Sequence, residues 1–160
     1  MTGRLLAAAL TAAALVWSAA IVLVPLTADH RASLVPRGLV HTAGALVCHQ
    51  RAERSFYLDG NRLPVCARCA GLYLAGTMGL LLGWAGRPRT IGARRMRVLL
   101  AAAAVPLAAT VALEWAGFGT PPNAVRAASA VPLGTLAGWL FAHMLRADGA
   151  ERQMGYHSGV

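Results

Sequence analysis

Residues 5–26 read LLAAALTAAALVWSAAIVLVPL, a run of twenty-two residues with no charged side chain that directly follows Arg4. An α-helix needs about 20 predominantly apolar residues to cross the hydrocarbon core of a bilayer, so this run is long enough to span it. The hydrophobic stretch of a cleaved signal peptide has only about 7–15 residues, which is shorter than this run. We therefore expect residues 5–26 to form a first membrane-spanning helix that is not removed.

Three further apolar stretches indicate that the chain crosses the membrane again. Together with the first, they predict an all-α membrane protein with about four transmembrane helices in a single membrane domain, residues 1–160. A short polar tail, residues 146–160, is expected to fray. The expected transmembrane helices are residues 5–26, 69–86, 98–115 and 127–145.

Small residues mark one face of the second expected helix. Gly71, Ala75, Gly79 and Gly83 recur every four residues and therefore lie on one side of a helix. Small side chains at this spacing allow two helix backbones to approach closely in lipid. We expect this face to pack against another transmembrane helix.

The composition fits a membrane protein better than a soluble one. Hydrophobic residues make up 57% of the chain, the mean hydropathy is +0.53, and the apolar residues lie in long blocks. All fifteen basic residues are arginine, and arginines that hold loops against anionic lipid explain the net charge of +9. We expect membrane lipids as partners and no nucleic acid, and the sequence is compatible with a homo-oligomer.

The segment between the second and third expected helices predicts the topology. Arg87–Arg97 holds five arginines in eleven residues, and loops rich in basic residues stay on the cytoplasmic side. We therefore expect this loop and both termini on the cytoplasmic side of a multi-pass protein. The membrane expected is the cytoplasmic (inner) membrane of a prokaryote. Four crossings bring the loop before Cys69 to the same membrane face as Glu114, Asn123 and Arg126.

The segment between the first two expected helices is a Cys/His loop, residues 41–69. Its apolar stretch, residues 39–48, is too short to cross the bilayer. We expect this stretch to lie in the interface or to enter the membrane part-way as a re-entrant segment. Residues 55–65 (SFYLDGNRLPV) read as a short extended run, a turn at Asp59-Gly60-Asn61 and a return.

Three cysteines within 22 residues carry the main chemical signal of the sequence. Cys66 and Cys69 form a CxxC pair, which can place two sulfurs on one tetrahedral metal ion, and Cys48 could supply a third. With His49 the set is Cys₃His, which predicts a zinc site. Because neighbouring residues rarely ligate one ion together, the fourth ligand is left open between His49, His41 and a water or substrate.

Two other interpretations of the cysteines stay open. Cys66 and Cys69 lie at the N-terminal end of an expected helix, where the helix dipole and Arg68 favour a thiolate. The pair could therefore be the dithiol of a membrane thiol–disulfide oxidoreductase coupled to quinone, with Cys48 as the exchange partner. Alternatively, the protein is a non-catalytic membrane scaffold in which a metal only fastens the loop.

Glu114 lies deep in an apolar run, where ionisable residues are usually paired or functional. Arg126, across a short turn, is its natural partner, either in a structural ion pair or beside a carboxyl group that handles protons. Arg54, Arg68 and Asn123 complete an expected polar cluster. Its guanidinium groups could bind an anionic lipid or metabolite.

One extended pattern in this segment is specific enough to suggest a family. The pattern CHQ-x₃-RSF-x₃-G-x₃-PVCARC-x-G-x-Y resembles the signature of the domain of unknown function 2085 family, which comprises small prokaryotic membrane proteins. Members of this family also tend to have an acidic residue at the end of the third helix and an Asn and an Arg at the start of the last helix. Glu114, Asn123 and Arg126 resemble these three positions. The resemblance implies a membrane protein and no particular activity. The residues that carry the pattern are Cys48, His49, Gln50, Arg54, Ser55, Phe56, Gly60, Pro64, Cys66, Arg68, Cys69, Gly71 and Tyr73.

Overall fold

The computed structural model describes residues 2–27, 34–85 and 91–157. This part of the chain folds into α-helices, a 3₁₀ turn and one small hairpin. The elements in chain order are α1 (Thr2–Leu26), α2 (Leu34–Val47), η2 (Ala52–Arg54), β1 (Tyr57–Leu58), β2 (Asn61–Arg62), α3 (Ala67–Ala85), α4 (Ala93–Trp115) and α5 (Asn123–His157).

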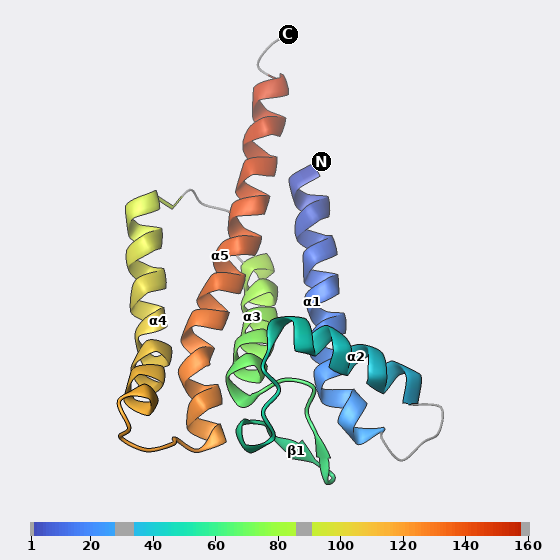
Figure 1. Ribbon diagram of the computed structural model, residues 1–160. Coiled ribbons are helices and arrows are strands. Elements are labelled where there is room, and N and C mark those ends of the chain that lie inside the picture. The colour runs from blue at the N-terminus through green and yellow to red at the C-terminus, as the bar shows by residue number, and fades with distance from the viewer. Residues whose placement is uncertain (1, 28–33, 86–90, 158–160) are drawn as a thin grey trace.

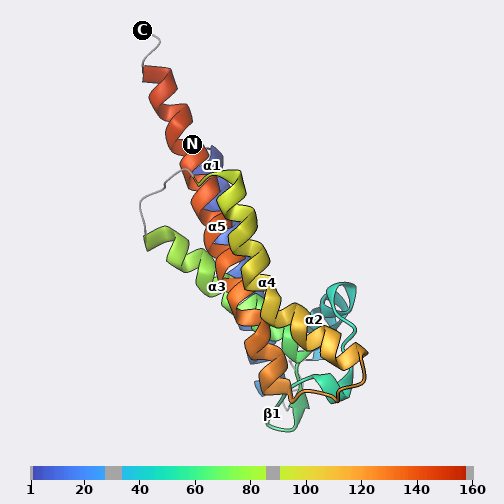
Figure 2. The same ribbon diagram turned by 90° about the vertical axis from the view of Figure 1, so that its left-hand side faces the viewer.

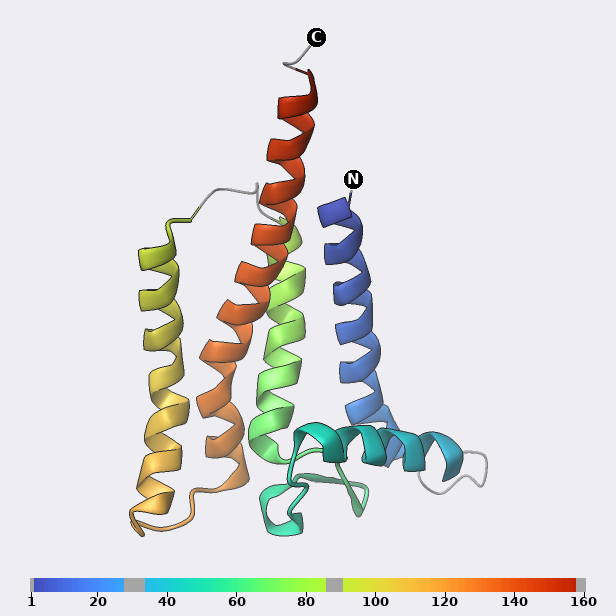
Figure 3. The ribbon, with the colours of Figure 1, turned by 45° about the horizontal axis from the view of Figure 1, so that its top comes forward.

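Four of the helices run alongside one another in an elongated bundle. Figure 1 shows α4, α5, α3 and α1 side by side, with α2 lying across one end of the bundle. The hairpin and the turn between α4 and α5 lie at that same end (Figures 1 and 3). The last part of α5 extends beyond the bundle at the opposite end, which also holds the N-terminus (Figure 2).

Three of the described helices are long and apolar enough to cross a membrane. They are Gly3–Leu26, Ala93–Trp115 and Asn123–Ala147. The helix α3 is not among them, although the sequence predicted four crossings. Arg68 and four glycines lower its hydropathy, because none of these residues favours transfer into lipid.

The helix α3 packs against α5 through the small residues that the sequence singled out. Gly71, Ala75, Gly79 and Gly83 are all buried, which confirms the predicted packing face. A Cβ atom added at Gly79 would overlap the backbone of α5. The two backbones are therefore in direct contact, as small residues at this spacing allow.

The predicted turn after Ser55 is a two-residue hairpin turn. The strands β1 and β2 pair antiparallel, with Tyr57 opposite Arg62 and Leu58 opposite Asn61. Asp59 and Gly60 have positive φ angles of 48° and 76°, as the favoured two-residue hairpin turn requires. The hairpin covers a small core in which Ile21, Cys48, Leu63, Val65 and Ala70 pack together.

Two expected segment boundaries differ from the structure. The polar tail expected from residue 146 is helical, because α5 continues to His157 through a sequence rich in helix-forming residues. The arginine-rich loop is shorter than expected, because α4 begins at Ala93 and includes three of its arginines. Residues 87–90 of that loop and residues 158–160 of the tail lie outside the described residues.

The apolar stretch expected to lie in or near the interface belongs to α2. This helix of 14 residues exposes Leu39, Leu46 and Val47 at 66%, 85% and 55% of their surface. The helix lies across the end of the bundle (Figure 1).

Candidate metal and ligand site

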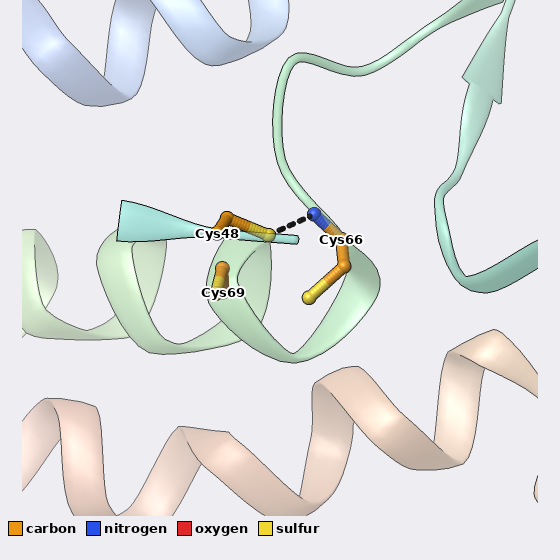
Figure 4. Close-up of side chains that lie close together, drawn as sticks. All are labelled: Cys48, Cys66 and Cys69. Carbon is orange, nitrogen blue, oxygen red and sulfur yellow. Dashed lines mark hydrogen bonds between the residues drawn. The ribbon is translucent and has the colours of Figure 1, made fainter. Parts of the chain in front are cut away.

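The three cysteine side chains meet at the end of the bundle where α2 ends and α3 begins. Cys48 directly follows α2, Cys66 directly precedes α3, and Cys69 lies in the first turn of α3. Their three Sγ atoms all lie within 4.8 Å of one another, and none of the three forms a disulfide (Figure 4). Two segments that are seventeen residues apart in the sequence thus build one sulfur cluster.

Gln50 fixes the backbone that brings Cys48 to the CxxC motif. Its φ angle of 48° reverses the chain just after Cys48, a conformation that is uncommon outside glycine. Its side-chain Nε2 donates hydrogen bonds of 2.6 Å to the carbonyl oxygens of His41 and Pro64. The Gln50 carbonyl accepts a third bond, of 2.8 Å, from Arg62. The side chain and the backbone carbonyl of this one residue therefore connect α2, the loop and the approach to α3.

Backbone amides point at the sulfur of Cys48. The amide of Cys66 donates to Cys48 Sγ at 3.1 Å (Figure 4). The amide of Gln50 donates to the same atom at 3.5 Å. The positive end of the α3 dipole lies beside the cluster as well. Hydrogen bonds to the charged form and a helix N-terminus both stabilise a thiolate over a thiol.

The pKa of the Cys66 thiol is lowered from 9.0 to about 5. The largest cause is a hydrogen bond from the Cys69 side chain, and the backbone amide of Cys69 and the Cys48 side chain also lower the pKa. Desolvation by burial opposes them. A thiolate at Cys66 at neutral pH is the form that both metal binding and thiol exchange require.

The geometry of the sulfur cluster fits a tetrahedral metal ion. Zinc–sulfur bonds of about 2.3 Å at tetrahedral angles place two sulfurs about 3.8 Å apart, so the sulfurs here need to move by no more than about 1 Å. Among the described residues, no histidine belongs to the cluster. His49 is exposed, while Nδ1 of His41 lies 3.0 Å from the Arg37 carbonyl.

A second cluster lies beside the first and is centred on Glu114. The pair between Glu114 and Arg126 that the sequence suggested is present, with 2.9 Å between Oε1 and Nη2. Arg54 contacts the same oxygen at 2.9 Å, and Arg68 contacts Oε2 at 2.8 Å. Asn123 joins the cluster by accepting a 3.2 Å hydrogen bond from Arg126.

The Glu114 cluster carries an excess of positive charge. Three guanidinium groups surround one carboxylate, and the side chains of Glu114 and Arg126 are only 7% and 4% exposed. The Nε atoms of Arg68 and Arg126 are buried and have no hydrogen-bond partner among the residues that the structure describes. An unsatisfied buried donor costs about 1–3 kcal/mol, and more when it is charged.

The sequence placed Arg54 and Arg68 in the polar cluster, but as a direct partner of Glu114 it suggested Arg126 alone. These arginines are 60 and 46 residues away from Glu114 along the chain, so no local spacing links them. The roles of Gln50 and Ser55 as connectors were missed too, although both belong to the quoted signature. Ser55 is 2% exposed, and its carbonyl accepts a 3.0 Å hydrogen bond from Asn123 Nδ2.

These features define a helical membrane protein that gathers a three-cysteine cluster and an arginine-rich cluster at one end of its bundle. The chain belongs to the family described as predicted membrane protein (DUF2085), whose profile matches residues 48–140. The match begins at Cys48 and includes every residue of both clusters.

Two archaeal proteins resemble short parts of the chain. An uncharacterised protein of Methanocaldococcus jannaschii is 42% identical over 38 residues, which are 24% of this chain and 24% of that protein. An uncharacterised protein of Methanothermobacter thermautotrophicus is 50% identical over 28 residues, which are 18% of this chain and 25% of that protein. The matches thus span about a quarter of the length of each relative. No solved structure matches the chain.

Proposed function

We propose that this protein is a multi-pass protein of the cytoplasmic membrane that binds a zinc ion through Cys48, Cys66 and Cys69. In this proposal α3 is the fourth crossing, beside α1, α4 and α5. Its 19 residues rise about 28 Å as a helix, which approaches the thickness of the hydrocarbon core of about 30 Å. The arginine-rich cluster beside the metal then binds an anionic lipid or metabolite.

The convergence of the three sulfurs is the observation that carries this proposal. Thiolate sulfur is a preferred ligand of zinc, and the amides that donate to Cys48 are the outer contacts that orient such a ligand. Because His49 and His41 lie outside the cluster, the proposal leaves the fourth position to water or a ligand. Three protein ligands and an open position are typical of catalytic zinc sites.

Elemental analysis of the full chain, purified in detergent, tests the metal site. We expect about one zinc per chain in the wild type. Cys66→Ser should lose the zinc, whereas His49→Ala should keep it. Cobalt substitution of the wild type, which does not depend on the folding of a variant, should give a thiolate-to-cobalt absorption band. A wild-type protein without zinc, and without that band after addition of cobalt, would contradict the proposal.

The second candidate function is thiol–disulfide oxidation coupled to quinone, and two observations favour it. The lowered pKa of Cys66 suits a reactive dithiol. An apolar pocket of about 460 Å³, lined by Trp17 and Tyr73 among others, lies between α1, α3 and α5. Both aromatic residues also pack against the core that contains Cys48.

The redox step in this candidate oxidises Cys66 and Cys69 in the metal-free protein. The Cys66 thiolate and the Cys69 thiol lose two electrons and one proton as the S–S bond forms, and the quinone takes up both electrons, that proton and a second proton from solvent to become the quinol. Mixing the reduced protein with a short-chain quinone should then produce the Cys66–Cys69 disulfide, detected by mass spectrometry, and one quinol per chain. Persistence of both free thiols with excess quinone would exclude this function.

A further inference from the structure

The Glu114 cluster has the positive charge and the N–H donors of an anion-binding site. The Glu114 carboxylate neutralises only part of that charge and accepts hydrogen bonds from only some of those donors. Arg54, Arg68 and Arg126 bring three positive charges to one negative charge. Among the described residues, Glu114 is the one acidic side chain in an ion pair with them. The excess of two charges is the charge of a doubly ionised phosphate monoester, whereas a carboxylate or a phosphate diester neutralises only half of it.

The unused hydrogen-bond donors of the cluster also favour a phosphate group as the ligand. A guanidinium binds a phosphate best through two parallel N–H groups. The Nε groups of Arg68 and Arg126 are buried without partners in the described part of the chain, and the Arg126 side chain is 4% exposed. A tetrahedral phosphate has enough acceptor oxygens to take both donors, which the two oxygens of Glu114 do not reach. The cluster also lies at the N-terminus of α5, where the helix dipole favours an anion.

The position of the least buried arginine shows where a ligand could enter. The Arg54 side chain is 34% exposed, compared with 17% for Arg68 and 4% for Arg126. It comes from the short η2 turn, whereas the other two arginines are held on long helices. Arg54 is therefore the arginine that can move outward from Glu114 to admit an anion.

An apolar pocket shares a wall with the cluster. It has a volume of about 290 Å³ and lies between the end of α4 and the start of α5, lined in part by Leu113, Phe118 and Val125. Thr110 lines it too, and the carbonyl of this residue accepts a 3.3 Å hydrogen bond from Arg68. A molecule with a charged head and a hydrocarbon tail fits this combination, because the head and the tail each find a matching environment.

We infer that Arg54, Arg68 and Arg126 bind the doubly charged phosphate of a monoester, either in a lipid headgroup or in a water-soluble phosphate. This inference rests on the proposed role of the cluster in binding an anionic ligand and names the class of that ligand. Glu114 holds the three arginines in place until the phosphate enters beside it.

The test uses the full chain in phosphatidylcholine nanodiscs, with binding measured by calorimetry. The probes are short-chain phosphatidic acid, which is a monoester, short-chain phosphatidylglycerol, which is a singly charged diester, decanoate, and inorganic phosphate. We expect phosphatidic acid to bind at least tenfold more tightly than phosphatidylglycerol or decanoate. Arg54→Gln should weaken this binding about tenfold, since it removes one charge-assisted contact.

Arg51→Gln is the matched control for this variant. Arg51 lies on the same loop and is exposed, and no ion pair with it occurs among the described residues, so its loss should leave the affinity unchanged. Competition by inorganic phosphate would assign the site to a soluble phosphate, and lack of competition would assign it to a lipid; either result supports the inference. Equal effects of Arg51→Gln and Arg54→Gln would overturn it.

Two other outcomes separate this inference from the function proposed above. Equal or tighter binding of decanoate or phosphatidylglycerol would overturn the assignment to a phosphate monoester but keep an anionic ligand. If no anionic probe binds more tightly than phosphatidylcholine, both the inference and the proposed ligand role fail, and the zinc proposal is not affected.

Discussion

The ion pairs of Glu114 connect three helices and a loop. Its carboxylate contacts Arg54 after α2, Arg68 on α3 and Arg126 on α5, while Glu114 itself lies near the end of α4. In α4, no described residue is fully buried, so apolar packing holds this helix only weakly. The ion pairs are therefore a main attachment of the end of α4 to the bundle.

Glu114→Gln should destabilise the protein strongly. The substitution keeps the size of the side chain but leaves buried arginine charge without a counter-ion, a change that typically costs about 3–5 kcal/mol. Unfolding in detergent, followed by tryptophan fluorescence, measures the effect. Glu53→Gln removes the same charge from an exposed position and should change the stability by less than about 0.5 kcal/mol. Equal stabilities of the two variants would show that the cluster does not hold α4.

Cys66 should react with alkylating reagents at lower pH than an ordinary thiol does. Because its pKa is lowered to about 5, the metal-free protein carries a Cys66 thiolate at every pH above that value. Its alkylation rate should therefore be nearly constant from pH 6 to pH 8 and fall below pH 5, whereas an ordinary thiol, with a pKa of about 8.5, reacts roughly tenfold more slowly for each unit below that value. Mass spectrometry of peptides labelled with iodoacetamide gives the profile for each cysteine.

Removing the hydrogen bond from Cys69 provides the control for this profile. In Cys69→Ala the largest cause of the lowered pKa is lost, so the alkylation profile of Cys66 should shift toward higher pH. A profile of Cys66 that rises steadily up to pH 8 in the wild type would contradict the arrangement of the three sulfurs.

At the scale of the elements, the contact between α3 and α5 depends on glycine. A Cβ atom at Gly79 would overlap the backbone at Thr135, whereas one at Gly76 would lie 3.7 Å from the Gly134 carbonyl, an ordinary contact. Gly79→Ala should therefore force the helices apart and cost about 1–3 kcal/mol. Gly76→Ala is the matched control, in the same helix, and should leave the stability unchanged or slightly raised. Thermal unfolding of both variants in detergent makes the comparison.

The sequence predicted those helices and turns that depend on a single local pattern of residues. The long uncharged runs gave α1, α4 and most of α5, and the four-residue spacing of small residues gave the face of α3 that packs on α5. The hairpin turn followed from Asp59-Gly60, because both positions can adopt positive φ angles. The C-terminal extension of α5 was missed because polar residues that favour a helix resemble those of a frayed tail.

The sequence predicted the components of the site better than their contacts. Residue types and the number of expected crossings marked the three cysteines as candidates, together with the polar cluster of Arg54, Arg68, Glu114, Asn123 and Arg126. His49 was included because it is adjacent to Cys48, yet one of these neighbours is buried and the other exposed. The contacts of Arg54 and Arg68 with Glu114 depend on how the bundle closes, which no spacing along the chain encodes.

At the scale of the whole molecule, Arg68 connects the two clusters. It lies between Cys66 and Cys69 in the sequence, and its Nη2 atom binds both Glu114 and the carbonyl of Thr110. The first turn of α3 and the residue before it thus carry two sulfurs and also the guanidinium that contacts Glu114 on α4. A metal ion bound to the sulfurs would hold this turn in place and with it Arg68. Binding or loss of the metal would therefore change how firmly Arg68 is held against Glu114.

Removing the metal should consequently loosen the end of α4. We expect that treating the zinc-loaded protein with a chelator raises amide hydrogen exchange in residues 66–70 and also in residues 108–116, because Arg68 loses its fixed position. Residues 93–100, at the other end of α4, are the internal control and should not change, since they lie far along the helix from the ion pairs. Cys66→Ser should reproduce the pattern without a chelator. Faster exchange confined to residues 48–70 would show that the sulfur cluster and the Glu114 cluster act independently, because local unfolding spreads only through elements that share contacts.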